Sequence, residues 1–318
     1  MHYDVFNGDA DGIIALVQLR LDQPKETTLI TGVKRNIELL KQVDSSKALS
    51  VTVLDISLEK NAQALNELLA KKVNVFYVDH HRTGDVPQND SFTAILNTDA
   101  NTCTSLLVNE YLHGHYANWA IAAAFGDNMT QSAQQLAEKT NLTEQQTSLL
   151  SELGVYINYN GYGRTVDDLH FHPAELFKKL MKFQDPLELI AQENSVFAQL
   201  KQAYLQDMTK AQNATILSET SACKIVQLAD EAWARRVSGV FGNELANQSP
   251  DKAHAVLTLN SDQTYTVSVR APLNNKQGAD QICIQFPTGG GRAGAAGINQ
   301  LSHEQLAQFI EVMSNYYT

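Results

Sequence analysis

The amino-terminal third of the chain alternates between short apolar runs and longer segments in which apolar residues recur at helical spacing. The apolar runs predict five strands, and the segments between them predict helices. The predicted strands cover residues 3–6, 27–33, 50–54, 73–78 and 92–96, and the predicted helices cover 13–21, 37–43 and 58–71. This alternation is typical of a mainly parallel sheet with helices on both faces.

The middle of the chain has a helical pattern, with predicted helices at 105–112, 118–125 and 131–138. Thr143 and Gln146 have the spacing of a capping box that starts a further helix. The segment 188–212 has helical periodicity and few helix-breaking residues, so we interpret it as one connecting helix.

A shift in composition near Thr215 marks a smaller region that mixes strands and helices. Strands are predicted at 223–228, 253–259 and 265–270, a helix is predicted at 231–245, and Ser302 with Gln305 predicts the capping box of a last helix. We therefore predict an α/β fold with a mainly parallel-sheet domain at 1–187, a connecting helix at 188–214 and a smaller α+β domain at 215–318.

Composition and charge narrow the classes of function. The three cysteines are odd in number and far apart, which argues against a disulfide framework and favours a reducing cytoplasm. The first residues do not have the pattern of a signal peptide, and no apolar run reaches the roughly 18 residues of a membrane span. A net charge of −11 argues against a grip on long nucleic acid but is compatible with a small anionic substrate.

Candidate metal ligands follow the predicted strands at the point where each strand ends. The apolar run 73–78 leads directly into Asp79, His80 and His81, and Asp55 follows the strand 50–54. The first strand is followed by Asp9 and Asp11 in the segment Asp-Ala-Asp-Gly. The carboxyl ends of parallel strands are where open α/β sheets present ligands, and carboxylate with imidazole suits Mn²⁺, Zn²⁺ or Fe²⁺.

Each of these residues also has an ordinary structural interpretation. Asp-x-Asp-Gly is a common loop, Asp55 can cap the following helix, and Asp127 after Gly126 is typical of a cap or turn. The strand-end carboxylates would nevertheless repel one another at one edge of a sheet unless a cation lay between them. Their clustering therefore favours the metal interpretation.

A glycine-rich segment near the carboxyl terminus is a candidate anion site. Gly289, Gly290 and Gly291 would let backbone N–H groups approach a phosphate, and Arg292 could clamp the phosphate with two hydrogen bonds. The alternative is a flexible turn of small residues. Arg270, at the end of a predicted strand, is a second candidate clamp, or else an edge-strand arginine in solvent.

Together these residues resemble the DHH phosphoesterase superfamily, in its branch of RecJ-type exonucleases and nano-RNA phosphodiesterases. The matching positions, in order, are Asp9-Ala10-Asp11-Gly12, Asp55, Asp79-His80-His81 and Asp127. Gly289-Gly290-Gly291-Arg292 and Ala295-Ala296-Gly297 resemble the DHH-associated substrate-binding domain. The resemblance spans nearly the whole chain, and it implies a phosphohydrolase with two Mn²⁺ ions, or Mg²⁺ or another divalent ion in their place.

The resemblance also implies a role for each matched residue. Asp9 and Asp55 would hold one metal ion, and Asp11, Asp55, His80 and Asp127 would hold the other. Asp79 would orient an imidazole, His81 would face the substrate phosphate, and Arg292 would complete the predicted catalytic set. Arg270 with Gly289, Gly290, Gly291 and Arg292 would bind substrate from the second domain.

Two departures concern the first metal position. Many members have a histidine four residues before the first aspartate, where this chain has Val5, and some have one two residues before it, where this chain has Asn7. An amide oxygen is a poorer ligand than imidazole for such metals. A third departure is Arg292 in place of a histidine, because guanidinium does not exchange protons near neutral pH.

We therefore predict a cytoplasmic, metal-dependent phosphohydrolase acting on short oligonucleotides or on nucleotides such as 3′,5′-bisphosphates. No binding to long duplexes or membranes is expected, and a homodimer is left open. The alternative is a non-catalytic nucleotide-binding or regulatory module with a degenerate first metal site.

Overall fold

The computed structural model describes residues 1–99 and 101–318. The chain divides into two compact units, Met1–Gln202 and Ala203–Thr318.

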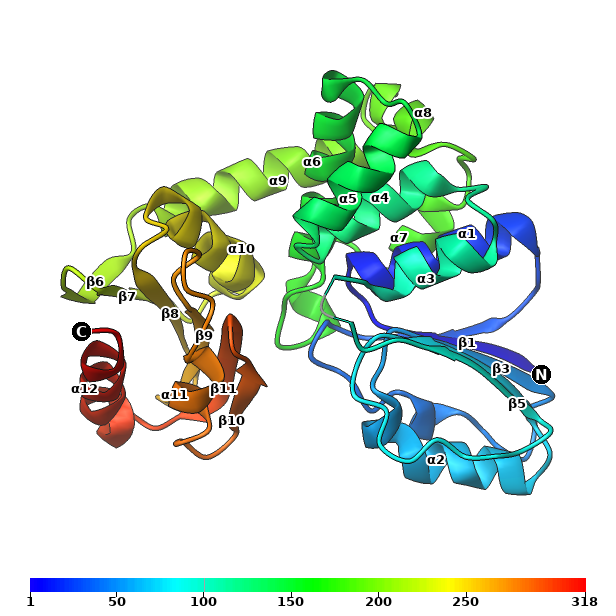
Figure 1. The fold of residues 1–318 in the computed structure, drawn as a ribbon, viewed down its shortest axis with the longest axis horizontal. Coiled ribbons are helices and arrows are strands. Elements are labelled where there is room, and N and C mark those ends of the chain that lie inside the picture. The colour runs from blue at the N-terminus through cyan, green and yellow to red at the C-terminus, as the bar shows by residue number, and fades with distance from the viewer. Residues whose placement is uncertain (100) are drawn as a thin grey trace. The chain divides into compact units, whose positions relative to one another are not determined.

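The first unit is built on a parallel sheet of five strands (Figure 1). The strands are β1 (His2–Phe6), β2 (Thr28–Ile30), β3 (Ser50–Leu54), β4 (Asn74–Asp79) and β5 (Phe92–Leu96), in the order β2-β1-β3-β4-β5. The central strands are buried on both faces, which explains their nearly continuous apolar sequences. Because all five run in the same direction, their carboxyl ends meet at one edge, which is where the candidate metal ligands lie.

Helices cover both faces of this sheet (Figure 1). One face is covered by α2 (Leu58–Ala70), and the other by α1 (Ala10–Asp22) with α3 (Thr104–Tyr111). Helix α1 also packs on α4 (Ala117–Gly126) and is buried from Ala10 to Arg20, in keeping with the apolar run at 13–17 in its centre. The burial of α1 fixes the position of its first turn, which carries Asp9 and Asp11.

The rest of the first unit is helical, as predicted. It contains α5 (Thr130–Lys139), α6 (Glu144–Asn160), α7 (Pro173–Leu180), α8 (Pro186–Ala191) and the first part of α9 (Val196–Ala211). The predicted capping box is confirmed, because Thr143 accepts a hydrogen bond from the backbone of Gln146 and the Gln146 side chain accepts one from the backbone of Thr143. Among the residues described, no helix is long and apolar enough to cross a membrane.

Two helix predictions in this unit are wrong. The predicted helix at 37–43 is only a 3-10 turn, Leu40–Gln42, because the Asn61 side chain bonds the backbone of Ile37 and Leu40 in place of helical partners. The predicted helix at 188–212 is two helices, α8 and α9. The helical conformation is interrupted between them, where Asn194 adopts a left-handed conformation with φ of 58°.

The second unit contains a mixed sheet of six strands. Its strands are β6 (Thr215–Glu219), β7 (Cys223–Leu228), β8 (Ala253–Leu259), β9 (Tyr265–Arg270), β10 (Gly289–Arg292) and β11 (Ala295–Leu301), in the order β10-β11-β9-β8-β7-β6. The β7–β8 pair is parallel and the other pairs are antiparallel. The predicted fold class, an α/β chain with a smaller α+β region at its end, is confirmed.

Helices also pack on the second sheet. Alternate residues of β8 point to one core, which includes Phe286 beside α11 (Ala279–Cys283) and Phe309 of α12 (Leu306–Tyr317). Val256, on the other face of β8, lies next to α10 (Ala232–Gln248). The capping box of Ser302 and Gln305 is present just before α12, as predicted.

The glycine-rich segment is a β-hairpin rather than a loop. Gly289 to Arg292 form β10, which pairs with Ile298 to Ala295 of β11. Gly291 has a φ of 146°, and a Cβ atom there would lie 2.4 Å from the Cα atom of Ala296, so this strand position requires glycine. The predicted anion-binding role of the segment stays a prediction.

Candidate metal centre

The turn from β1 into α1 places two carboxylates at the edge of the sheet. Asp9 is the N-cap of α1 and accepts a hydrogen bond of 3.0 Å from the Gly12 backbone. Asp11 lies inside the first turn and accepts backbone hydrogen bonds of 2.7 Å from Thr104 and from Ser105. Gly12 is required by this tight turn, because a Cβ atom would lie 2.4 Å from the carbonyl oxygen of Asn7.

Asp55 lies at the centre of the edge, directly after β3. It has a φ of 59°, a left-handed conformation that costs aspartate and asparagine less than most residues. Its backbone N–H donates to the carbonyl of Val78 on β4, and its carboxylate accepts a hydrogen bond of 3.1 Å from the Thr104 hydroxyl. The Asp55 side chain is only 2% exposed.

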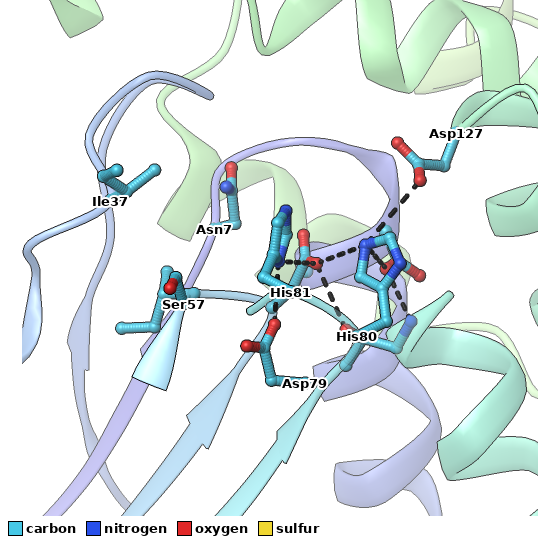
Figure 2. A network of polar contacts seen from close by, with 12 residues as sticks. Asn7, Ile37, Ser57, Asp79, His80, His81 and Asp127 are labelled. Atoms are coloured by element: carbon cyan, nitrogen blue, oxygen red, sulfur yellow. Dashed lines mark hydrogen bonds and ion pairs between the residues drawn. The ribbon is translucent and has the colours of Figure 1, made fainter. Parts of the chain in front are cut away.

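Strand β4 ends at Asp79, and His80 and His81 follow it directly (Figure 2). His80 Nε2 lies 3.5 Å from Asp55 Oδ1 and 3.8 Å from Asp127 Oδ2. His81 Nδ1 lies 2.8 Å from Asp79 Oδ1 and 3.7 Å from Asp55 Oδ1. The imidazoles of the two histidines therefore reach different carboxylates around the central Asp55.

Asp127 enters this group from another part of the fold. It is the C-cap of α4, and Asn128 after it has a φ of 62°. The Oδ2 atom of Asp127 is buried and finds no hydrogen-bond partner in residues 1–99 and 101–318. A buried carboxylate oxygen that is left unpaired is costly, which favours a ligand that the protein itself does not supply.

Two groups of side chains have the geometry to hold a divalent cation. The ligand atoms of Asp11, His80 and Asp127 lie within 4.8 Å of one another, as do those of Asp55, His80 and His81. Carboxylate oxygen with imidazole nitrogen is a donor set that fits Mn²⁺ or a similar ion. The residues present therefore fit the predicted metal.

Asp9 is excluded from both groups and has a lysine as its partner. Lys34 Nζ lies 2.6 Å from Asp9 Oδ2, 3.3 Å from Asp127 Oδ1 and 3.1 Å from the side-chain oxygen of Asn158. We did not predict Lys34 or Asn158 from the sequence. A partial signal was available for Lys34, because it follows β2 at the same edge of the sheet, whereas Asn158 comes from α6 without any motif.

The pKa values of the buried carboxyl groups differ with the charges that surround them. Burial, together with the charges of Asp11 and Asp9, raises the pKa of Asp55 well above its usual range. Burial raises the pKa of Asp11 as well, and the charge of Asp127 adds to this shift. Burial would also raise the pKa of Asp9, but the Lys34 ammonium more than offsets burial, so that the pKa of Asp9 lies below its usual value.

The pKa of the His81 imidazole is shifted upward. Burial lowers this pKa, but the hydrogen bond and the charge of Asp79 outweigh burial. The result is an imidazole that Asp79 holds in one orientation while its side chain remains 44% exposed.

Comparisons with known proteins identify the fold. A structure of exonuclease RecJ bound to manganese superposes with a TM-score of 0.63 over 99% of this chain and 89% of its own, at 14% identity. A pGpG-specific phosphodiesterase, PggH from Vibrio cholerae, superposes with a TM-score of 0.54 over the whole of both chains, at 12% identity. The chain has the fold of the DHH phosphoesterases. CDC45 from Entamoeba histolytica is similar too, with a TM-score of 0.50 over all of this chain and 95% of its own, at 9% identity. No protein-family model matches the sequence, and neither does any curated protein.

Within this DHH fold, the two residues that replace the expected histidines have structural contacts. Val5 is fully buried in the sheet. Asn7 donates a side-chain hydrogen bond of 3.2 Å to the carbonyl of Lys34, and its side-chain oxygen accepts one of 3.3 Å from the Asp9 backbone. Asn7 therefore connects the loop that carries Lys34 to the turn that carries Asp9.

The predicted substrate-binding residues belong to the second unit, and their approach to the DHH residues stays a prediction. Arg270 donates to the Asn243 side chain at 2.6 Å and to the Gly239 carbonyl at 3.2 Å, both on α10. These bonds fix its guanidinium on the face of β9 that packs against α10. Arg292 is exposed at the end of β10.

Proposed function

We propose that this chain is a metal-dependent phosphohydrolase that cleaves small phosphate esters, either the phosphodiesters of short oligonucleotides or the phosphomonoesters of nucleotides such as 3′,5′-bisphosphates. The observation that carries this proposal is the convergence of Asp11, Asp55, His80 and Asp127, from four separate segments, on one buried site with metal-binding geometry. Such convergence at the carboxyl ends of parallel strands is typical of a functional site.

Two observations support a small substrate. The structural similarity to the pGpG-specific phosphodiesterase covers both chains from end to end, so that no added region distinguishes their architectures. The net charge of −11 also disfavours the many phosphate contacts by which proteins hold long nucleic acids. A short nucleotide requires only a few cationic contacts.

The side chains of the centre would have separate roles in metal binding and in contact with the substrate phosphate. Asp11, Asp55, His80 and Asp127 would hold the divalent ion, which when bound supplies a Lewis acid for the phosphoryl group and lowers the pKa of water. Asp79 positions His81 through the hydrogen bond of 2.8 Å. His81 is the exposed imidazole of the pair, and it would meet the substrate phosphate and hold or move a proton there.

The second unit would supply the remaining phosphate contacts. In this proposal Arg292 and the backbone of Gly289, Gly290 and Gly291 bind the substrate, and Arg270 fixes α10 beside β9 or contacts substrate directly. Replacing Arg292 should raise KM for a charged substrate and leave metal binding unchanged.

Hydrolysis by a conservative variant of the central carboxylate tests the proposal. Asp55→Asn keeps the left-handed backbone conformation, which asparagine tolerates, and removes the charge by replacing one carboxylate oxygen with an amide nitrogen. We expect wild-type protein with Mn²⁺ to hydrolyse an aryl phosphodiester and the dinucleotide pGpG, and Asp55→Asn to lose at least about 100-fold in kcat/KM. Asp44→Asn, an exposed carboxylate paired with Lys47, is the matched control and should retain the rate. Equal rates for Asp55→Asn and wild type would contradict the proposal.

A second candidate function is a nucleotide-binding module without catalysis, and the Lys34–Asp9 ion pair favours it because it occupies one predicted metal ligand. Mn²⁺-dependent binding of a nucleotide with no hydrolysis of either test substrate would support this candidate over the first.

A further inference from the structure

The Lys34 ammonium lies inside the centre, beside Asp9, a carboxylate that the resemblance assigns to the first of two metal ions. Its Nζ atom contacts Asp9 and Asp127, two of the five aspartates and histidines predicted as metal ligands. The Lys34 side chain is 24% exposed and that of Asp9 only 3%, so the shorter contact is shielded from water. The side-chain oxygen of Asn158 completes the set of acceptors around the ammonium.

Backbone hydrogen bonds and close packing fix the position of Lys34. The Lys34 N–H donates to the Gly161 carbonyl at 2.8 Å, and its carbonyl accepts the bond from Asn7. The loop before it lies so close to the β1–α1 turn that a Cβ atom on Gly8 would lie 1.8 Å from the Gly32 carbonyl oxygen. A lysine on a flexible surface loop would not need such a close approach.

We propose that the Lys34 ammonium takes the place of one divalent ion, so that the centre binds a single metal ion on Asp11, His80 and Asp127, with Asp55 as a further ligand. The inference rests on the proposed function in one respect, namely that the centre binds metal at all. Lys34 would then be a fixed cation in the site, and Asp9 would serve to hold it.

Charge and ligand supply both support a single ion. The charge of Asp9 is already balanced by the ammonium at 2.6 Å, and a divalent ion on Asp9 would be repelled by that ammonium. Asn7, the residue at one of the expected histidine positions, uses its side-chain oxygen to accept from the Asp9 backbone. The Asp127 Oδ2 atom, in contrast, lies 3.8 Å from His80 Nε2 and has no hydrogen-bond partner within the described parts of the chain.

Counting metal ions in the wild-type protein is the first test. After chelator treatment and dialysis against Mn²⁺, elemental analysis and titration calorimetry should give one tight ion per chain. Electron paramagnetic resonance should show the spectrum of isolated Mn²⁺ without spin coupling between neighbouring ions. Two ions per chain with a coupled spectrum would overturn this inference and leave the proposed function intact, whereas no bound ion would overturn both.

Variants at Lys34 provide the second test. Lys34→Gln removes the ammonium and should raise the count from one ion to two, with spin coupling, because Asp9 is then free to bind metal. Lys34→Arg keeps a cation and should stay at one ion. Lys41→Gln, which removes an exposed ammonium paired with Glu38, is the matched control and should also stay at one. A single ion in Lys34→Gln that is folded by circular dichroism would overturn the claim that Lys34 displaces the second ion. If Lys34→Gln does not fold, the count in the wild type and in Lys34→Arg still decides.

Discussion

Asp9 and Asp55 are both buried aspartates at the same sheet edge, yet the pKa values of their carboxyl groups are shifted in opposite directions. Asp9 has an ammonium at 2.6 Å, and its pKa lies below the usual value. Asp55 contacts the Thr104 hydroxyl and has imidazoles at 3.5 and 3.7 Å, and its pKa lies well above the usual value. The Asp9 side of the centre therefore carries its own cation, Lys34, whereas in the proposed account the Asp55 side would take a cation from solution.

Removing the cation from the Asp9 half should have the largest effect on stability. In metal-free protein, Lys34→Gln leaves Asp9 buried without a counter-ion, and we expect a loss of about 3 kcal/mol in the free energy of unfolding. Urea denaturation can measure this loss in a Trp233→Phe background, where the fluorescence of buried Trp119 reports on the first unit alone. The exposed-lysine control Lys41→Gln should leave the free energy of unfolding nearly unchanged. An equal loss of unfolding free energy in Lys34→Gln and Lys41→Gln would show that Asp9 does not depend on Lys34 as its counter-ion.

Weakening the contact between Asp79 and His81, on the Asp55 side of the centre, should lower activity more than stability. Asp79→Asn weakens the hold on His81, and we expect kcat/KM for a phosphodiester to fall by about 10- to 100-fold. The same variant should lower the pKa of the His81 imidazole, because the charge that raises this pKa is removed. Both effects can be measured, by kinetics and by nuclear magnetic resonance titration of metal-free protein. An unchanged His81 pKa would show that Asp79 does not act on it.

Neutralising Asp55 should stabilise the metal-free protein, and only above a certain pH. Because the folded-state pKa of Asp55 is raised, folded wild type loses stability as the pH rises above the unfolded value of about 3.9 toward the folded value. Asp55→Asn has no such loss. We expect a gain of about 1–2 kcal/mol at pH 8 that shrinks as the pH falls toward 4. Urea midpoints across this range would test it, and a gain that grows toward low pH would have the wrong sign.

The smallest effect is expected at the hydroxyl that contacts Asp55. Thr104→Val keeps the shape of the side chain and removes its hydrogen bond, so metal-free protein should lose about 1 kcal/mol at pH 8. Saturating Mn²⁺ should compensate the charge of Asp55 and reduce this loss. Thermal melting of wild type and Thr104→Val, with and without Mn²⁺, measures this change. If Mn²⁺ left the loss unchanged, the bound ion would not act on the charge of Asp55.

The sequence predicted the half of the centre whose signal is local. Asp79, His80 and His81 directly follow a buried strand, and Asp55 follows its neighbour, so the direction of the strands alone placed them together. Asp127 was harder to place, because it is a helix cap, as its local sequence suggested, and also part of the site.

Lys34 and Asn158, the partners on the Asp9 side, were not predicted, because their positions depend on packing between distant segments. Lys34 reaches Asp9 because Gly8 and Gly32 lie in close contact, and because Asn158 and Gly161 come from the end of α6. No period or spacing in the sequence records such contacts. The same limit applies to the glycine-rich segment, which forms a strand because it pairs with β11, and β11 in turn pairs with β9.

A crystal structure of the Mn²⁺-loaded protein, with anomalous scattering measured at the manganese edge, tests the central claim most directly. We predict one anomalous peak per chain, bounded by Asp11, His80 and Asp127, with the Lys34 ammonium still in contact with Asp9. A peak beside Asp9 with Lys34 displaced, or no peak at this edge of the sheet, would contradict the account.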